Sequence, residues 1–328
     1  MKHYINSVMA LSALAYNKIL LHFDTSANNT WNKFYDTNPP SLKSGKNVNP
    51  KASDGNCFIY NGVFIGSTIQ INNINNHIYF LLSDSFFANC TGESQGVIDF
   101  IGNSSIVQNR ICVYNSTSTA SSQHSYTNLV DGSIHKNHIS ESSYYLCGGS
   151  QIKDSPTNFL KNGNINVYLI NTSFCNSAGI YTEPSSDQCN ISFSTFSNLT
   201  AQNSIVDLYQ KTNYVFKFCN VLSNSLTNGS YGILYVFKAS VTIEKCSFLG
   251  NSGKGVEFYA NEGKITIKDS YCDRNETSGI VNTDRISTEY IVNNPLHFSS
   301  YNCEAKYTPI KLVSTKKFVY RRYILTRR

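Results

Sequence analysis

The chain of 328 residues is poor in charge and lacks several common signatures. Charged residues make up 15% of it, whereas ordinary globular domains hold about a quarter. No run of about 18 apolar residues occurs, so no transmembrane helix is expected. The sequence also contains no CxxC pair, GxSxG, HExxH, phosphate loop or dinucleotide fingerprint. A helical membrane protein and the enzymes defined by these motifs are therefore not predicted.

The positive charge lies at one end. The formal net charge is +6, and the last 23 positions hold eight basic residues: Lys306, Lys311, Lys316, Lys317, Arg321, Arg322, Arg327 and Arg328. The rest of the chain carries 19 basic and 21 acidic residues. A near-neutral body does not predict a nucleic-acid groove. The tail could contact anionic lipid or RNA, or it could be a solvated terminus.

Cysteine is too sparse for a disulfide-dense scaffold, since ten residues are spread over the whole chain. From Cys189 onward they recur at intervals of 30, 27, 26 and 31 residues. This spacing predicts one small buried residue per structural repeat. We expect buried free thiols, with some disulfides as the alternative, and neither a metal site nor a cofactor.

A repeat is visible near the C-terminal end. VTIEKCSFLGNSGKGVEF, residues 241–258, aligns without a gap with ITIKDSYCDRNETSGIV, residues 265–281, at a shift of 24. Residues 213–237 fit the same template. The aligned positions include Val241 with Ile265, Ile243 with Ile267, Cys219 with Cys246, Asn224 with Asn251 and Asn275, and Gly232 with Gly255 and Gly279. Self-similarity at this period is typical of solenoids and propellers.

The content of each unit favours one of these folds. Units of 22 to 31 residues hold two or three short strands and no helical period, which is typical of a parallel β-helix. A propeller blade needs about 40 residues, and leucine-rich repeats need regularly placed leucines. We therefore expect an all-β, right-handed parallel β-helix of about nine coils of about 25 residues each.

Stacking of the coils would bring equivalent side chains together. Asn251 and Asn275 would form a side-chain ladder, and the glycines before Ile or Val would lie at corners that need backbone freedom. Lys217, Glu244 and Lys268 would occupy one outward column, and Lys245 would meet Asp269 in the next. We interpret these alternating charges as contacts that stabilise the stack, rather than as a catalytic cluster.

Four parts follow from these patterns. Residues 1–23 predict an amphipathic capping helix or a weak signal peptide. Residues 24–56 lack any period and predict a linker or loop. Residues 57–283 predict the β-helix, and residues 284–328 form a C-terminal segment with the basic tail.

Short motifs in the repeats resemble a known family. Five FxxN tetrads begin at Phe86, Phe100, Phe159, Phe248 and Phe258, and Gly-Ile or Gly-Val corners follow several strands. Together they resemble the degenerate repeats of right-handed β-helix surface proteins of the polymorphic outer membrane protein type, including the expanded trichomonad families. The full Gly-Gly-Ala triplet of that pattern does not occur, and no C-terminal barrel or membrane anchor is recognised. The resemblance implies a pectin-lyase-like fold and a role as an adhesin or displayed surface antigen.

An enzymatic alternative is considered because many β-helices cleave polysaccharides. That chemistry needs two carboxylates, or calcium-binding carboxylates with a basic residue, facing one groove from adjacent coils. The nearest candidates are Asp269, Asp273, Arg274 and Glu257. The histidines His135 and His138 lack an acidic or cysteine ligand at metal-site spacing and predict a polar loop.

The sequence favours a non-catalytic β-helix protein for surface display, adhesion or binding of a glycan or protein. Smooth faces with rows of exposed Tyr and Asn would favour a binder. A host or neighbouring-cell glycan or protein is the expected partner, and an extracellular or cell-surface location is the expected compartment. The alternatives are a polysaccharide lyase or glycoside hydrolase, and a fragmentary or intracellular scaffold without a dedicated ligand.

Overall fold

The structure, a computed structural model, describes residues 27–51, 55–150, 154–210, 212–274 and 276–287. The chain divides into two compact units, Met1–Pro39 and Pro40–Arg328. The predicted capping helix or signal segment at residues 1–23 lies outside the described residues, as does most of the basic C-terminal segment.

The first unit contains helix α2 (Ala27–Phe34). Trp31 and Tyr35, one helical turn apart, have ring centroids separated by 4.8 Å. Trp31 Nε1 donates a hydrogen bond to the carbonyl oxygen of Thr37 at 2.9 Å, beyond the end of the helix. The structure thus differs from the loop expected over residues 24–56, because local aromatic contacts support a helix that the polar composition concealed.

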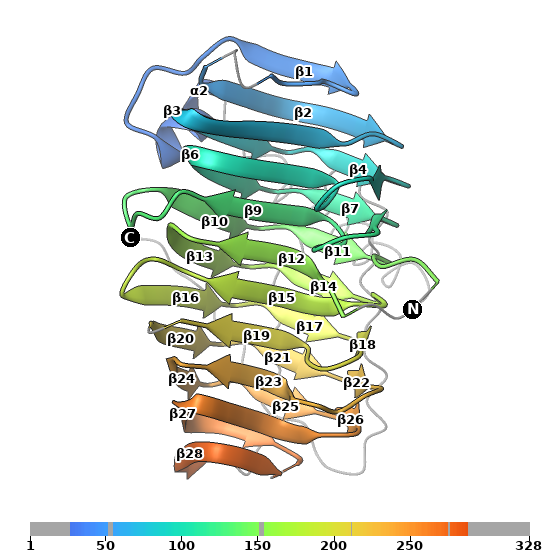
Figure 1. The fold of residues 1–328 in the computed structure, drawn as a ribbon, viewed down its shortest axis with the longest axis vertical. Coiled ribbons are helices and arrows are strands. Elements are labelled where there is room, and N and C mark those ends of the chain that lie inside the picture. Colours follow the sequence, from blue (N-terminus) through green and yellow to red (C-terminus); the bar gives the residue numbers. More distant parts are fainter. Residues whose placement is uncertain (1–26, 52–54, 151–153, 211, 275, 288–328) are drawn as a thin grey trace, which may run out of the picture. The chain divides into compact units, whose positions relative to one another are not determined.

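The second unit is a β-solenoid of about eight turns, in place of the nine expected. Its paired strands run parallel and follow one another down the stack, from β1 to β28 in Figure 1. Coil length varies, and this accounts for the smaller number. Ile111 and Ser142 are stacked neighbours 31 positions apart, whereas Cys246 and Ser270 are only 24 apart.

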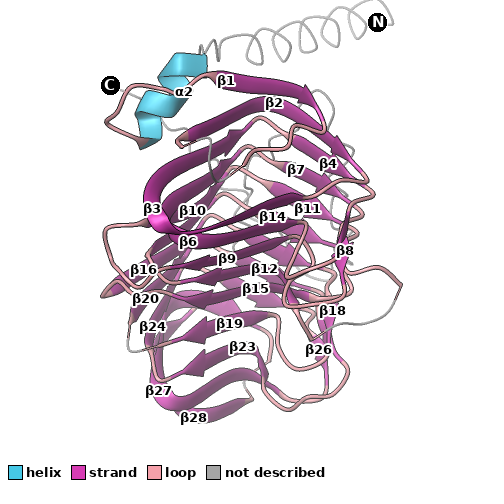
Figure 2. Cartoon of the chain, turned by 45° about the horizontal axis from the view of Figure 1, so that its top comes forward, coloured by secondary structure: helices cyan, strands magenta, loops and turns pink. Residues whose placement is uncertain are grey.

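Three strand faces enclose the interior (Figure 2). The first face comprises β10 (Lys136–Ser140), β13 (Asn164–Tyr168), β16 (Gln188–Ser192), β20 (Asn213–Lys217) and β24 (Ser240–Glu244). The second comprises β4 (Phe86–Ala88), β7 (Cys112–Tyr114), β11 (Ser143–Tyr145), β14 (Asn171–Ser173), β17 (Thr195–Ser197), β21 (Asn220–Leu222) and β25 (Ser247–Leu249). The third comprises β9 (Ser125–Leu129), β12 (Pro156–Lys161), β15 (Ala178–Glu183), β19 (Val206–Tyr209) and β23 (Gly232–Phe237).

Longer and shorter strands complete the coils. The strands that pass from the third face to the first are β3 (Ile69–Ser83), β6 (Ile98–Asn109), β27 (Val256–Cys272) and β28 (Thr277–Ile286). The stack begins with β1 (Leu42–Lys46) and β2 (Cys57–Ile65). Short strands pair beside the main sheet: β5 (Thr91–Gly92) with β8 (Thr117–Ser118), and β18 (Thr200–Ala201) with β22 (Ser225–Leu226) and β26 (Ser252–Gly253). The solenoid thus starts earlier than residue 57 and runs slightly past residue 283.

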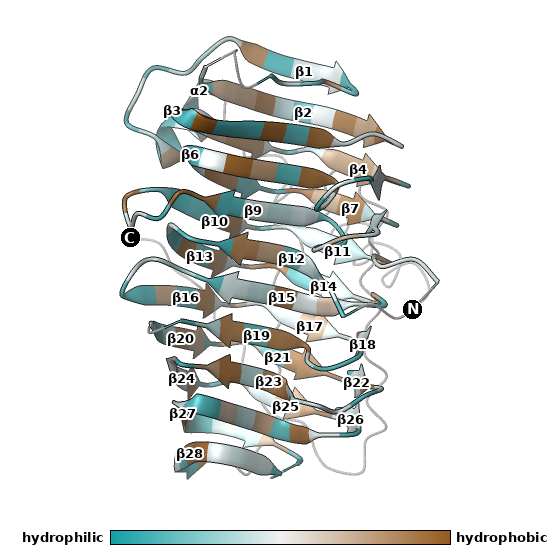
Figure 3. Cartoon of the chain, in the orientation of Figure 1, coloured by the Kyte–Doolittle hydropathy of each residue, from teal (hydrophilic) through white to brown (hydrophobic). Residues whose placement is uncertain are grey.

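The predicted register between the last full coils is confirmed. Ile243 pairs with Ile267 and Val241 with Ile265 across β24 and β27. Inward apolar residues alternate with outward polar ones along β24 and at the start of β3, where Figure 3 shows alternating brown and teal bands. Buried phenylalanines pack against one another in the interior at an angle, with ring centroids of Phe216 and Phe248 6.3 Å apart and those of Phe248 and Phe258 4.7 Å apart.

The corners repeat as regularly as the strands. Phe218 and Lys245, which precede the inward cysteines Cys219 and Cys246, both have a left-handed backbone with φ of 54°. A single left-handed residue turns the chain from the first face to the second, so no long loop is needed there. A bend therefore precedes each of these two inward cysteines.

The FxxN tetrads do not share one place in the coil. Phe159 lies on the outer side of β12, between Tyr126 and Tyr181. Phe248 is fully buried on β25, and Phe258 is buried on β27, where it pairs with Leu234. The tetrads therefore mark strand ends of several kinds rather than a single structural position.

Candidate functional site

The recurring cysteines and asparagines line two interior corner columns. The Cys219 amide donates a hydrogen bond to the Cys246 sulfur at 3.3 Å, and the Cys246 amide donates to Ser270 Oγ at 3.1 Å. In the other column, Asn224 Nδ2 donates to Asn251 Oδ1 at 3.0 Å. Asn275, predicted to extend this ladder, lies outside the described residues. These contacts occur in the interior and support the stack.

Of the cysteines in the described ranges, Cys112 is disulfide-bonded and eight are free thiols: the buried Cys57, Cys90, Cys147, Cys175, Cys189, Cys219 and Cys246, and the partly buried Cys272. Burial raises the pKa of Cys189 and Cys246. Such thiols are poor nucleophiles because the thiolate is the reactive form.

The glycines of the template fall into two groups. Gly255 and Gly279 have φ of 98° and 81°, a conformation that side chains rarely adopt. Gly232, at the start of β23, is not in the left-handed region, and a Cβ there would meet the Val256 carbonyl oxygen at 3.0 Å. Close packing, rather than the expected corner conformation, explains a glycine at this position.

The four residues proposed for catalysis do not converge on one outward groove. Asp269 forms an ion pair with Arg285. The hydrogen bond from Arg285, with a smaller contribution from the expected partner Lys245, lowers the pKa of the Asp269 carboxyl. Asp273 Oδ2 accepts a hydrogen bond from the Gly250 amide at 2.6 Å. Asp269 thus binds a residue of the last strand, and Asp273 binds the backbone of a corner in the preceding coil.

Glu257 is fully buried, with an exposed fraction of 0%. Its Oε1 accepts a hydrogen bond from Asn251 Nδ2 at 2.8 Å, and its Oε2 lies 4.0 Å from Arg274 Nε. Burial raises the pKa of Glu257 to about 7, although Asn251 and Arg274 act in the opposite direction. The Glu257 carboxyl belongs to the interior ladder and is not presented to solvent.

The described surface with the longest run of stacked rings is the outer side of the third face. We call it the aromatic face and define it by Tyr126, Phe159, Tyr181, Tyr209, Tyr235, Phe237 and Tyr259. These residues point away from the interior because side chains alternate along β9, β12, β15, β19, β23 and β27, which succeed one another in Figure 1. Six of the seven rings are partly exposed, whereas Tyr235 is covered by its neighbours and only 3% exposed. Six strands at about 4.8 Å spacing give a surface about 24 Å long.

Ring geometry changes along the aromatic face. Tyr126 and Phe159 stack at 4.9 Å, and Phe159 and Tyr181 at 4.3 Å with planes only 4° apart. Beyond Tyr181 the rings tilt: Tyr209 lies 4.6 Å from Tyr181 at 32°, and 5.7 Å from Tyr235 at 67°. The face therefore has a flat half and a half whose rings stand at angles to one another.

Polar groups accompany the rings. Glu183 Oε1 lies 3.1 Å from Lys161 Nζ and accepts a hydrogen bond from Gln210 Nε2 at 2.6 Å. Its Oε2 accepts a hydrogen bond from the Tyr181 hydroxyl at 2.9 Å. Burial and the neighbouring Glu183 raise the pKa of Tyr181, so this hydroxyl stays protonated. Asn261 donates to the Tyr235 hydroxyl at 3.0 Å. The face thus combines apolar ring surface with fixed hydrogen-bonding groups.

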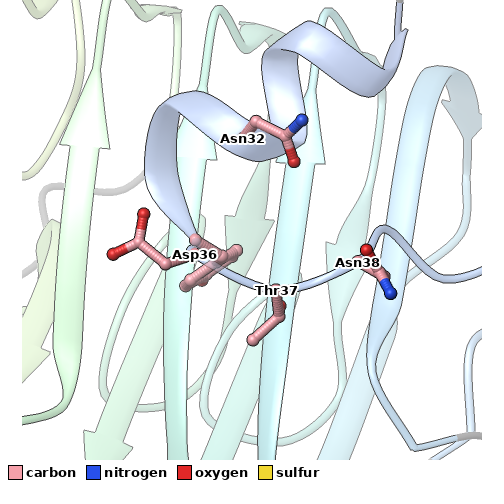
Figure 4. Close-up of a pocket in the computed structure, with 5 residues that line it drawn as sticks. Asn32, Asp36, Thr37 and Asn38 are labelled. Atoms are coloured by element: carbon pink, nitrogen blue, oxygen red, sulfur yellow. The ribbon is translucent and has the colours of Figure 1, made fainter.

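Two hollows lie elsewhere. One of about 600 Å³ lies beside helix α2 and is lined by Asn32, Tyr35, Asp36, Thr37 and Asn38. Figure 4 shows the labelled side chains Asn32, Asp36, Thr37 and Asn38 pointing in different directions. Another of about 390 Å³ is lined by corner residues that include Lys238, Glu262 and Lys264. Neither brings functional groups to one point.

Within the described ranges, no cluster of three or more His, Cys, Asp or Glu side chains is arranged to hold a metal ion. His124 is buried and His138 is partly buried, and burial lowers the pKa of His124 to about 3 and that of His138 to about 4. His135 contacts His77 with ring centroids 5.0 Å apart.

In the part of the chain that the structure describes, no helix has the length and apolar character needed to cross a membrane.

Comparison with known proteins supports the class of fold. Residues 158–300 match the family model described as a right handed beta helix region. Together with the parallel pairing of the coils, this match assigns the solenoid to the right-handed β-helices. No curated protein and no solved structure matches the chain.

Sequence reasoning did not identify the aromatic face. The available signal was an aromatic residue just after several Gly-Ile or Gly-Val steps, as in Gly179-Ile180-Tyr181 and Gly232-Ile233-Leu234-Tyr235. The strand alternation sends these rings outward, where they do not contribute to the apolar period on which the repeat was recognised.

Proposed function

We propose that this chain is a non-catalytic β-helix that binds a glycan along the aromatic face. The main observation in support is the continuous outward stack of rings from Tyr126 through Phe159 to Tyr181. Flat, partly exposed rings offer apolar surface to the C–H faces of sugars, while the hydroxyl and amide groups beside them can bind sugar hydroxyls. A surface that crosses several coils suits an extended polymer better than a small molecule.

Display at a cell surface or outside the cell fits this activity. The FxxN tetrads and Gly-Ile corners, which resemble the polymorphic outer membrane protein type and its trichomonad relatives, support the same role. A host or neighbouring-cell glycan is then the natural partner. Fractionation of cells that express a tagged full chain tests the location: recovery in the medium or at the surface is expected, and recovery only in the cytosol contradicts it.

Polysaccharide cleavage is the second candidate, since Glu183 and Asp207 lie on the adjacent strands β15 and β19 of this face. Both oxygens of Glu183 are engaged by Lys161, Gln210 and Tyr181. That occupancy favours a binding surface, because a nucleophile or base needs an oxygen free to meet the substrate. Release of new reducing ends from a bound polysaccharide would favour cleavage instead.

Glycan binding can be tested with a panel of soluble polysaccharides in affinity electrophoresis. Tyr181→Ala should weaken binding about tenfold, the effect of losing one well-placed aromatic contact. Tyr145→Ala is the matched control, because Tyr145 belongs to an outward ladder on the second face, 6.1 Å from Tyr114. Absence of binding to every polysaccharide, or equal losses in the two variants, would contradict the proposal.

A further inference from the structure

Asp207 interrupts the row of rings on the aromatic face. It pairs with Tyr181 on the preceding strand and with Tyr235 on the following one. Strand alternation directs its side chain outward among the rings, yet its exposed fraction is only 8%. Its Oδ1 accepts no hydrogen bond from any described residue. A carboxylate thus lies beneath the tilted half of the aromatic face with one oxygen unpartnered.

The charge on Asp207 is not balanced by the surrounding described residues. Asp154, which adds further negative charge, is held by Asn203 at 2.7 Å. The nearby Lys161 is paired with Glu183. Burial, with a smaller contribution from Asp154, raises the pKa of Asp207 to about 7, while a hydrogen bond from Ser204 acts in the opposite direction. A buried carboxyl without a basic partner is costly, so a role other than stability is expected.

We propose that Asp207 and the rings of Tyr181, Tyr209 and Tyr235 form a subsite for the ammonium group of an amino sugar. The inference rests on the proposed glycan binding and names the class of glycan: one whose sugars carry free, unacetylated amino groups. The sugar rings would lie along the stacked half of the aromatic face, and one ammonium group would enter the tilted half.

The geometry around Asp207 suits a cation. Tyr209 stands at 32° to Tyr181, 67° to Tyr235 and 56° to Phe237, with centroid separations of 4.6, 5.7 and 5.5 Å. Asp207 lies between Tyr181 and Tyr235 on the neighbouring strands, and a cation within about 6 Å of a ring centroid is attracted by the ring. An ammonium group would also donate a charge-assisted hydrogen bond to the free Oδ1.

Access to Asp207 runs past Tyr209. The Tyr209 ring is half-buried, and no hydrogen bond from its hydroxyl is found among the described residues. The backbone behind it is fixed, because the Tyr209 carbonyl oxygen accepts a hydrogen bond from the Tyr214 hydroxyl at 2.8 Å. In the proposed binding mode the Tyr209 side chain would change rotamer to admit the ammonium group, while the backbone stays in place.

The test uses the full chain and three hexasaccharides of the same linkage: glucosamine, N-acetylglucosamine and glucose oligomers. Calorimetric titration at one pH and ionic strength should show that the glucosamine oligomer binds about tenfold more tightly than the other two. Asp207→Asn, of equal size, should abolish that preference while keeping affinity for the neutral oligomers. Glu262→Gln should retain it, since Glu262 is an exposed carboxylate paired with Lys238 at a corner.

The possible failures are distinguishable. If none of the three oligomers binds, the proposed function itself is wrong. If all bind equally to the unmodified chain, glycan binding stands and the ammonium subsite is overturned, whether or not Asp207→Asn folds. Persistence of the preference in a folded Asp207→Asn variant also overturns it. If a lysine hexapeptide binds as tightly as the glucosamine oligomer and depends equally on Asp207, the ligand is a basic peptide and the sugar assignment is overturned.

Discussion

Asn224 donates a hydrogen bond through Nδ2 to Oδ1 of Asn251 at 3.0 Å, one coil further along the stack. The Asn224 backbone amide donates to the same oxygen at 3.1 Å. Asn251 in turn donates to the Val221 carbonyl oxygen at 3.0 Å and to Glu257 at 2.8 Å. A chain of buried polar groups therefore joins two successive coils.

Asn251→Ala should lower the free energy of unfolding by about 1–3 kcal/mol. It removes the oxygen that accepts hydrogen bonds from the backbone and side-chain amides of Asn224, and the donor to the buried Glu257 Oε1. Guanidinium denaturation followed by circular dichroism measures the change. Asn228→Ala is the control: Asn228 is exposed and bonded to Asn203 at 3.2 Å. Equal effects of the two substitutions would show that the buried ladder contributes little.

Glu257 predicts an unusual dependence of stability on pH. Its pKa in the folded chain is about 7, above the ordinary value of 4.5, so the folded state holds the proton more tightly than the unfolded state. Stability from this group is complete below about pH 4.5 and is lost as the pH rises through 7, by an amount on the order of 3 kcal/mol. Asp207, with its pKa also raised to about 7, acts in the same direction.

Glu257→Gln should therefore flatten the fall in denaturation midpoint between pH 5 and pH 8, and should leave the stability at pH 8 above that of the unmodified chain. Glu262→Gln, at a carboxylate with 64% of its side chain exposed, should leave the profile unchanged. A midpoint that rises through this pH range in the unmodified chain, or a Glu257→Gln profile of the same slope, would contradict the assignment.

Ser223 occupies a corner that suits glycine. Its φ is 53°, and Gly250, its counterpart in the next coil, has φ of 66°. The left-handed conformation costs a non-glycine residue about 1–2 kcal/mol, part of which is offset by the greater freedom of glycine in the unfolded chain. Ser223→Gly should raise the free energy of unfolding by up to about 1 kcal/mol.

The measurement is the shift in guanidinium midpoint. Ser230→Gly serves as the comparison, since Ser230 is exposed and is not among the residues with positive φ. That substitution should be neutral or destabilising. Loss of stability in Ser223→Gly would mean that the corner is held by side-chain contacts rather than strained by its backbone.

Sequence period predicted the register where the interior is apolar. Val241 and Ile243 repeat as Ile265 and Ile267 at a shift of 24 positions, and the strands pair accordingly. Residues 104–164 fit the repeat template less clearly, because several of their inward-facing side chains are polar. There Gln108 Nε2 donates to Ser125 Oγ at 2.7 Å, and Thr127 Oγ1 donates to Asn137 Oδ1 at 2.9 Å.

The candidate site was less accessible to prediction than the fold. The carboxylates near Arg274 were predicted as a catalytic group because they are close in sequence. In the structure, however, Glu257 is buried and Asp269 forms an ion pair with Arg285. The aromatic face depends on rings contributed by six strands, which stack only once the varying coil lengths are known. Tyr126 and Phe159 are 33 positions apart and Phe159 and Tyr181 only 22, so no single shift aligns them.

A polymer bound along the aromatic face would strengthen the solenoid against a pulling force. In a solenoid each coil contacts chiefly the coils before and after it, so a pulling force along the axis can peel the structure apart turn by turn. A glycan in contact with Phe159, Tyr181 and Tyr209 would tie together strands β12, β15 and β19, which lie on different coils. The bound glycan would then hold these coils together, so the solenoid would resist unfolding at the coils where the pulling force is applied.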